Sequence, residues 1–238
     1  MKIRQFAEDA LTIYLGDEID EAVNRQIVAL RHHIEAQSFE GVVEVILSYT
    51  SLIIHFEVFS VDLEKLKAAL EKIDIDALVQ EPFQYRVIEI PVCYGGEYGP
   101  DIGHFEASGL SEEDVVRLHA DTEYLVYMLG FMPGFPFLGG LDERLHKDRL
   151  ETPRVSIPAG SVGIGGRQTG MYPFESPGGW HLLGRTPVPL FDADRNPAIL
   201  YGAGDRIVYR SIGEDEYKDI EKRVAQGDYE VNSEVRNK

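Results

Sequence analysis

The sequence predicts an α+β fold, with a small N-terminal α/β domain over residues 1–82 and a β-barrel domain over residues 83–238. Up to residue 80 the patterns follow the order β-α-β-β-α, which is typical of a ferredoxin-like sheet with its helices on one face. In the rest of the chain, many short strand patterns and few helices indicate a barrel. Glu81-Pro82 interrupts the periodicity, and we place the domain boundary there.

Five elements are expected in the first domain: strands at residues 10–15, 42–47 and 52–58, and helices at residues 17–37 and from Asp62 onward. The first helix is predicted because Ile27, Leu30 and Ile34 recur at the spacing that places them on one face. The two later strands are β-branched runs on either side of a short polar turn, which indicates a hairpin. Asp62 is a suitable N-cap, and the leucines after it, with Ile73, would form the buried side of the second helix.

The second domain is expected to begin with a strand at residues 85–94. Pro91 interrupts this strand, and proline cannot donate to a sheet, so we expect an edge strand or one that bends. Ser111 and Asp114 fit a capping box, which predicts that a helix carrying His119 begins there.

A strand at residues 124–129 is predicted to lead into the turn-rich stretch that follows, and strands at residues 198–201 and 206–210 are predicted to close the barrel. A terminal helix is expected to be capped near Ser211 or Glu214. The tail after Gly227 is polar, and we expect it to fray.

The stretch at residues 130–187 is predicted to form short strands joined by tight, ordered turns. It holds twelve of the 23 glycines and seven of the 12 prolines in the chain. Glycine reaches backbone conformations closed to other residues, and proline fixes φ and removes a donor. Disorder is disfavoured because disordered segments are poor in aromatic and β-branched residues, whereas this stretch contains Phe135, Ile164 and Trp180 among others.

Composition and charge exclude several classes of function. The net charge is −18 and the pI about 4.7, so the chain should repel phosphate backbones and anionic lipids, and we expect no nucleic-acid or membrane partner. Cys93 is the only cysteine, which excludes an intrachain disulfide; within an apolar strand it should be a small buried hydrophobe. The start of the chain lacks a signal-peptide pattern, and no apolar run approaches the roughly 20 residues of a membrane helix. We therefore expect a cytoplasmic protein.

Familiar catalytic motifs are missing from the sequence. It contains no G-x-x-x-x-G-K-[ST] phosphate loop. The glycine cluster at residues 160–166 lacks the following helix and the acidic residue that a dinucleotide site needs, and Ser161 is not in the G-x-S-x-G spacing of a hydrolase. His32 and His33 are adjacent and would point to different sides of a helix, so no metal site is expected.

The candidate site consists of polar and aromatic groups on the turn-rich stretch. Guanidinium groups match carboxylates and phosphates, exposed glycine amides can receive an anion, and aromatic rings supply flat walls. Such a set suits a small carboxylate or amide ligand. Its members are Arg154, Ser161, Gln168, Thr169, Tyr172, Gly178, Gly179, Trp180 and Arg185.

Each candidate also has a structural explanation. Arg154 and Arg185 can equally brace loops through ion pairs, and Trp180 can be a core residue rather than a ligand wall. His119 follows acidic residues on a helix, where a packed or capped histidine is commoner than a base. The paired glycines can serve tight turns alone.

Three long strings resemble a known family: GFMPGFPFLGGLDERL, PRVSIPAGSVGIGGRQTGMYP and ESPGGWHLLGRTP. Together with AEDALTIYLGDEID, PVCYGGEYGPDI and AGDRIVYRSIGEDEY they follow the family's order, so the similarity covers nearly the whole chain. The sequence resembles the family of the 5-oxoprolinase B subunit (PxpB), also called allophanate hydrolase subunit 1, which includes the sporulation kinase inhibitor KipI.

The resemblance implies a small N-terminal α/β domain followed by a cyclophilin-like β-barrel. It also implies that the chain works with the A and C subunits of 5-oxoprolinase, contacting the C subunit through a barrel-to-barrel interface. Together they would hydrolyse 5-oxo-L-proline to L-glutamate at the expense of ATP. ATP would be a co-substrate of the complex, and no covalently bound cofactor is expected. Which of the subunits holds the ATP site stays open.

The lactam chemistry that the resemblance implies needs cations and amides around developing negative charge. Arg154 and Gln168 are then the catalytic candidates, and His119 would be a proton shuttle or an orienting group. The other members of the set would bind the substrate in the half-site that this chain supplies.

Two rival functions stay open. A KipI-like protein would bind a sensor histidine kinase and block its autophosphorylation without catalysis. A peptidyl-prolyl isomerase would follow only from the analogy of the barrel, and fold analogy does not carry a site.

Overall fold

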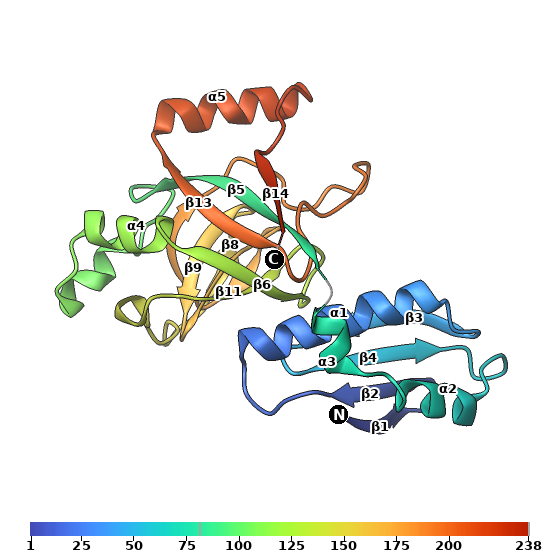
Figure 1. Cartoon of the computed structure of the whole chain (residues 1–238). Helices are drawn as coiled ribbons and strands as arrows, with labels where there is room; N and C mark the ends of the chain where they lie inside the picture. The colour runs from blue at the N-terminus through green and yellow to red at the C-terminus, as the bar shows by residue number, and fades with distance from the viewer. Residues whose placement is uncertain (81, 238) are drawn as a thin grey trace. The chain divides into compact units, whose positions relative to one another are not determined.

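The computed structural model describes residues 1–80 and 82–237 and has a mixed α/β architecture (Figure 1). Contacts divide the chain into two compact units, one of Met1–Gln84 with Asn237 and the other of Tyr85–Arg236, and each is described by itself. The predicted boundary falls partly on residue 81, which lies outside the described residues, so the division into domains 1–82 and 83–238 stays a prediction.

The first unit is an antiparallel sheet with the strand order β1-β2-β4-β3 and three helices. Helix α1 packs on β3 and β4 (Figure 1). The strands are β1 (Lys2–Ala7), β2 (Ala10–Tyr14), β3 (Val42–Leu47) and β4 (Ser51–Phe56), and the helices are α1 (Glu21–Gln37), α2 (Leu63–Leu70) and α3 (Ile75–Gln80).

The periodic elements of this unit are confirmed. Ile27, Leu30 and Ile34 on α1 are at most 1% exposed, as their spacing predicts. The helix begins later than predicted because the Asp20 side chain caps it by accepting from the backbone amides of the first turn. Asp62 caps α2 by accepting from the Lys65 amide at 3.0 Å, and the β3–β4 hairpin forms as expected.

The pattern missed two elements of the first unit. Strand β1, KIRQFA, is an edge strand with five of its six residues exposed, so it carries no apolar signal. Strand β1 pairs with β2 and is the fourth strand of the sheet. It comes before the predicted β-α-β-β-α elements in the chain, whereas a ferredoxin-like order would place the fourth strand after the second helix. Helix α2 also ends at Leu70, before Ile73, and the short helix α3 follows.

The second unit is built on an eight-stranded sheet with the order β10-β9-β12-β5-β13-β6-β7, and β14 also pairs with β5. A separate two-stranded ribbon pairs β8 with β11. The strands of the sheet are β5 (Gln84–Tyr94), β6 (Glu123–Leu129), β7 (Pro136–Gly139), β9 (Ser161–Gly165), β10 (Gln168–Met171), β12 (His181–Arg185), β13 (Arg206–Ile212) and β14 (Ser233–Asn237). The ribbon consists of β8 (Arg154–Ile157) and β11 (Ser176–Gly178). The helices are α4 (Glu112–Ala120) and α5 (Glu214–Ala225), and there are two 3₁₀ turns, η1 (Ile102–Ser108) and η2 (Glu143–Leu145).

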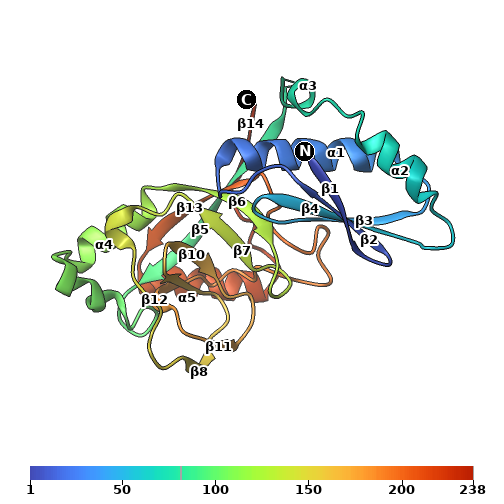
Figure 2. The same ribbon diagram turned by 90° about the horizontal axis from the view of Figure 1, so that it is seen from below.

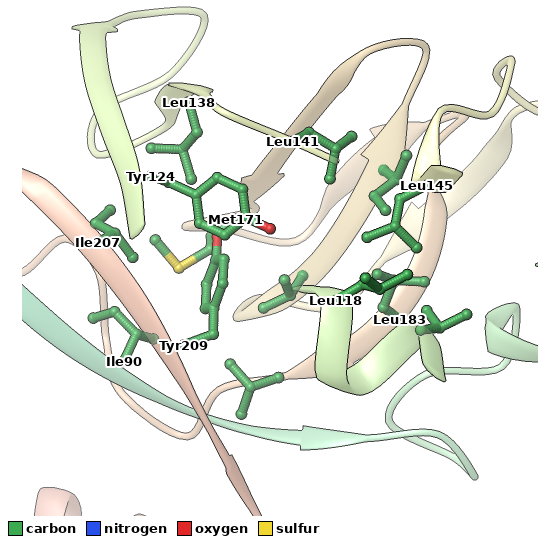
Figure 3. Packing of buried hydrophobic residues seen from close by; sticks show 14 of the residues in the cluster. Ile90, Leu118, Tyr124, Leu138, Leu141, Leu145, Met171, Leu183, Ile207 and Tyr209 are labelled. Atoms are coloured by element: carbon green, nitrogen blue, oxygen red, sulfur yellow. The ribbon is translucent and has the colours of Figure 1, made fainter. Parts of the chain in front are cut away.

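This sheet curls into a nearly closed barrel, seen from a second side in Figure 2. Its end strands approach each other so closely that a Cβ added at Gly170 on β10 would lie 3.2 Å from the Pro136 carbonyl on β7. Figure 3 shows the packed interior, where Tyr124 and Tyr209 lie among aliphatic side chains and Met171. The predicted barrel in the second half of the chain is therefore confirmed at this level.

Strand β5 is internal, so the first of the two alternatives predicted from Pro91, an edge strand, is wrong. On one side β5 runs parallel to β13, with Val87 to Cys93 opposite Arg206 to Ile212. On its other side the Glu89 amide donates to the Asn232 carbonyl, and β12 pairs only from Cys93 onward. Amides two residues apart point to the same side of a strand, so the N–H that Pro91 lacks would point to the side on which Asn232 and β12 lie. Pro91 falls between these two partners, where β5 has no neighbour on that side to bond.

The end of the chain differs from its prediction in two places. Residues 198–201 form no strand and contribute only a single bridge, between Phe191 and Ile199. The polar tail does not fray throughout, because β14 pairs with β5 and Arg236 contacts Glu123 at 2.9 Å. The terminal helix α5 forms from Glu214 as expected, but the predicted cap is wrong, because its N-cap is Gly213, which has no capping side chain.

The turn-rich stretch is ordered as predicted and contributes the six strands β7 to β12. Two glycines show why this composition is needed. A Cβ at Gly165 would lie 2.3 Å from Nε1 of Trp180, and Gly166 has a φ of +67° in the turn between β9 and β10. The capping box of Ser111 and Asp114 also begins α4 as expected.

None of the helices within residues 1–80 and 82–237 combines the length and apolarity needed to span a bilayer. Cys93 is buried and free, as predicted. Burial raises the pKa of its thiol, so the thiolate form is disfavoured.

Candidate functional site

His119 is fully buried and belongs to a hydrogen-bonded chain inside the barrel. Its Nδ1 lies 2.8 Å from the Tyr94 hydroxyl and its Nε2 lies 2.7 Å from the Thr169 hydroxyl. Thr169 in turn donates to the Gly163 carbonyl at 3.1 Å, and the His119 ring stacks on Tyr209 at 4.6 Å between centroids.

These contacts determine which atom carries each hydrogen in this series of hydrogen bonds. The single hydroxyl proton of Thr169 is donated to Gly163, so Thr169 accepts from His119, whose Nε2 must carry the hydrogen. Nδ1 then accepts from Tyr94. Burial lowers the pKa of His119 to about 3, so the ring is neutral at physiological pH. His119 is 0% exposed, so its ring is enclosed by its neighbours in this conformation.

Acidification is expected to weaken the protein through His119. The folded pKa of about 3 lies below the usual 6.5, so between these pH values the unfolded chain binds a proton that the folded chain does not. The free energy of unfolding should therefore fall as pH drops through this window. When the pH falls from about 7 to about 5, His119 should lower the free energy of unfolding by about 2 kcal/mol. Urea unfolding at both pH values measures it.

The variant His119→Gln isolates this contribution, because glutamine can still donate to Thr169 but does not titrate. Its free energy of unfolding should fall less steeply with pH than that of the wild type. The matched control is His32→Asn, which replaces an exposed histidine on α1 and should keep the wild-type slope. Identical slopes for His119→Gln and the wild type would contradict the buried, neutral assignment.

Arg154, at the start of β8, pairs with a buried carboxylate. Its Nη2 lies 2.6 Å from Oδ1 of Asp101, and its Nη1 donates to the Trp180 carbonyl at 3.3 Å. Asp101 is only 2% exposed, and its Oδ2 accepts from the Leu182 amide at 2.7 Å. Arg154 therefore braces a buried charge, which is the structural explanation. Because 30% of its side chain is still exposed, the ligand-binding explanation also has a basis.

Several predicted site residues lie beside Arg154. Gly178 is its partner in the β8–β11 ribbon, and a Cβ there would lie 2.6 Å from the Tyr172 hydroxyl. The Gly179 carbonyl accepts from the Leu150 amide at 2.7 Å. Of this group, Gly178 and Gly179 are partly exposed.

Other predicted residues are walled inside the fold. Tyr172 and Trp180 pack with Phe135 in a hydrophobic cluster, and burial raises the pKa of Tyr172 to about 12. Ser161 and Thr169 are at most 1% exposed. The core explanation that the sequence left open for Trp180 is the one that its packing supports.

The last two members, Arg185 and Gln168, lie at the ends of strands β12 and β10. Arg185, at the far end of β12, lies over the rings of Tyr98 and Tyr217, at 5.0 and 5.9 Å from their centroids. Gln168 is half-buried at the start of β10, opposite Gly165. The predicted set therefore does not converge on one open cleft.

Three residues of the Arg154 group were not found from the sequence. His104 and His181 lie with their Nδ1 atoms 3.1 Å apart, and Asp101 lies between His104 and Arg154. Their spacing of 77 residues gives no motif, and only the fold brings the two histidines together. Arg154, Asp101 and the two histidines therefore form one connected polar cluster.

Within residues 1–80 and 82–237, no group of three or more histidine, cysteine or carboxylate side chains is arranged to hold a metal ion. Two grooves with cavity volumes of about 480 and 610 Å³ lie in the first unit, lined by residues of α1, α2 and their neighbours. None of the predicted site residues lines either groove.

Comparison with known proteins gives a family match over most of the chain. Residues 1–201 match the model of the carboxyltransferase domain, subdomain C and D. A protein of Bacillus subtilis named as the B subunit of 5-oxoprolinase is 43% identical over 227 residues, which cover 91% of this chain and 95% of that protein. A protein of the same name from Haemophilus influenzae is 42% identical over 210 residues, covering 88% of this chain and 97% of that protein.

Solved structures share the same fold. The crystal structure of TTHA0988 superposes with a TM-score of 0.75 at 33% identity. The match covers 89% of this chain and 40% of the TTHA0988 chain, which is therefore considerably longer.

Proposed function

Because this chain belongs to the family of the 5-oxoprolinase B subunit, we propose that it serves as the B subunit of an ATP-dependent 5-oxoprolinase. The observation that carries the proposal is its similarity to curated B subunits over nearly the full length of both proteins. The names of these relatives support this role and do not support the kinase-inhibitor alternative.

In this proposal the chain is non-autonomous. It assembles with the C subunit through a barrel-to-barrel interface, and with the A subunit, in the cytoplasm. The complex converts 5-oxo-L-proline to L-glutamate, with ATP as co-substrate. The barrel would be cyclophilin-like and the first unit a variant of the ferredoxin-like arrangement whose fourth strand comes from the N-terminus.

The burial of the candidate residues suggests different roles for them. The partly exposed Arg154, Gln168, Gly178 and Gly179 would contact the substrate. The buried members would shape the barrel wall beneath them, and Arg185 would brace its end through its aromatic neighbours. The buried members are His119, Ser161, Thr169, Tyr172 and Trp180.

Replacing Gln168 by alanine is expected to abolish turnover in the assembled complex. The amide of Gln168 offers donors to the lactam oxygen as negative charge develops on it, and losing one such donor costs roughly 100-fold or more in rate. The measurement is 5-oxoproline-dependent ATP hydrolysis by the complex reconstituted from its A, B and C subunits. Size-exclusion chromatography should show unchanged association.

Gln226→Ala is the matched control, because it removes an exposed glutamine at the end of α5. It should leave both activity and association unchanged. Full activity in Gln168→Ala would refute the role of this residue in the half-site.

A further inference from the structure

A groove of about 610 Å³ opens in the first unit, between the end of α1 and the segment where α2 gives way to α3. Its apolar floor consists of Phe39, Ile73 and Leu78, all of which are only partly buried. Ile73 continues the apolar period of α2, but that helix ends at Leu70 and the chain turns before α3 begins at Ile75. The break between the two helices therefore leaves apolar side chains that the first unit does not cover by itself.

Small side chains form the walls of this groove. Ala68 on α2 and Ala77 on α3 line it, and both are exposed. Such an open groove does not enclose a small ligand, whereas small residues let another helix approach to about 8–10 Å between axes. None of the described residues that line the groove belongs to a strand, so an added β-strand would find no free sheet edge there. The shape favours a helix as the occupant.

The rim of the groove is positively charged. Lys65 on α2 and Lys72 just after it line the groove, and neither makes an ion pair in the part of the chain that the structure describes. Lys67, which does not line the groove, pairs with Glu64 at 3.3 Å. Asp74 also lines the groove, but its Oδ1 accepts from the backbone of α3 at 3.1 Å. Two unpaired cations therefore border an apolar floor in a chain whose net charge is −18.

The other groove of the first unit has the opposite charge. Glu71, Asp74 and Asp76 line it, and its described lining residues include no lysine or arginine. A cationic segment attracted by the acidic chain should prefer that groove, whereas the groove bordered by the two lysines suits an acidic segment.

We propose that the groove bordered by Lys65 and Lys72 binds an amphipathic helix of a partner protein, with one apolar face and one acidic face. The apolar face covers Phe39, Ile73 and Leu78, and the carboxylates beside it lie against the two lysines. This docking surface goes beyond the proposed function, because none of the candidate site residues lines it.

The test is a titration of the ¹⁵N-labelled full chain with a synthetic helical peptide of about 18 residues, with leucines on one face and glutamates on the other. Saturable shifts are expected at the backbone amides of Phe39, Ala68 and Leu78. Long-range repulsion by the acidic chain opposes adventitious binding of this peptide, so saturation reports the local groove. The same peptide with lysines in place of glutamates should leave the amides of Phe39 and Ala68 unshifted.

The variants Lys65→Glu and Lys72→Glu should each weaken binding of the acidic peptide about tenfold, because each replaces an attraction by a repulsion. Ala68→Tyr fills the groove from an exposed position and should weaken binding at least as much. The matched control is Lys222→Glu on α5, an exposed lysine whose replacement changes the net charge by the same amount. It should bind as the wild type does. Far-UV circular dichroism should show that all four variants keep the wild-type fold.

Unchanged affinity in both Lys65→Glu and Lys72→Glu, or an equal loss in Lys222→Glu, would overturn the charge-matched groove. A lack of saturable shifts up to about 1 mM peptide would overturn it as well. Displacement of the bound peptide by an equimolar amount of dodecanoate would show that a small anionic amphiphile is the better occupant, and would contradict the helix.

Discussion

Replacing Arg154 by alanine is expected to destabilise the second unit by about 3–5 kcal/mol, because it strands a buried charge. Asp101 is 2% exposed, and the Arg154 guanidinium neutralises one of its oxygens at 2.6 Å. The Leu182 amide satisfies only the other oxygen. A carboxylate left without its cation in a low-dielectric site costs far more than an exposed one. Urea unfolding at neutral pH measures the loss.

The matched control is Arg144→Ala, which breaks an equally short pair with Asp142 at the surface. This variant should lower the free energy of unfolding by less than about 1 kcal/mol, since water solvates both partners. The double variant Asp101→Asn/Arg154→Gln removes both charges together and should recover most of the loss, because asparagine can still accept from Leu182. Equal costs for Arg154→Ala and Arg144→Ala would contradict the dependence of Asp101 on Arg154.

This structural role changes how mutations of the site are interpreted. Loss of activity in Arg154→Ala would combine a lost ligand contact with a destabilised fold, so it cannot assign a catalytic role by itself. Gln168 is a better probe, because its uncharged side chain does not neutralise Asp101.

Elements with a strong apolar period could be predicted from the sequence. Helix α1, with Ile27, Leu30 and Ile34 on one face, and the β3–β4 hairpin follow directly from spacing and β-branched runs. The capping boundaries at Asp62 and Ser111 were equally clear, because a short polar side chain before a periodic run leaves few alternatives.

Strands held mainly by their partners could not be predicted. Strands β1 and β14 are mostly exposed and polar, so only their pairing with β2 and β5 makes them strands. Pro91 was misplaced for a related reason. Its position in an internal strand depends on where β14 and β12 begin to pair with β5, and this is a tertiary property.

The candidate site was predicted in part. Composition indicated the ordered turn-rich stretch and Arg154, but not which side chains would face inward. Thr169 is buried because strand β10 and its neighbours β9 and β12 are covered along nearly their whole length, and Trp180 packs with Phe135 and Tyr172 in a separate cluster. The pairing of His104 with His181 joins distant segments and leaves no trace in sequence spacing.

The central claim is that this chain completes a 5-oxoprolinase, and one measurement tests it most directly. The two partners, the A and C subunits, are assayed for ATP hydrolysis and glutamate release with 5-oxo-L-proline, in the presence and absence of this chain. We expect turnover only when all three are present, and no turnover by this chain alone. Equal activity of the two partners without the chain, or no activity with it, would contradict the account.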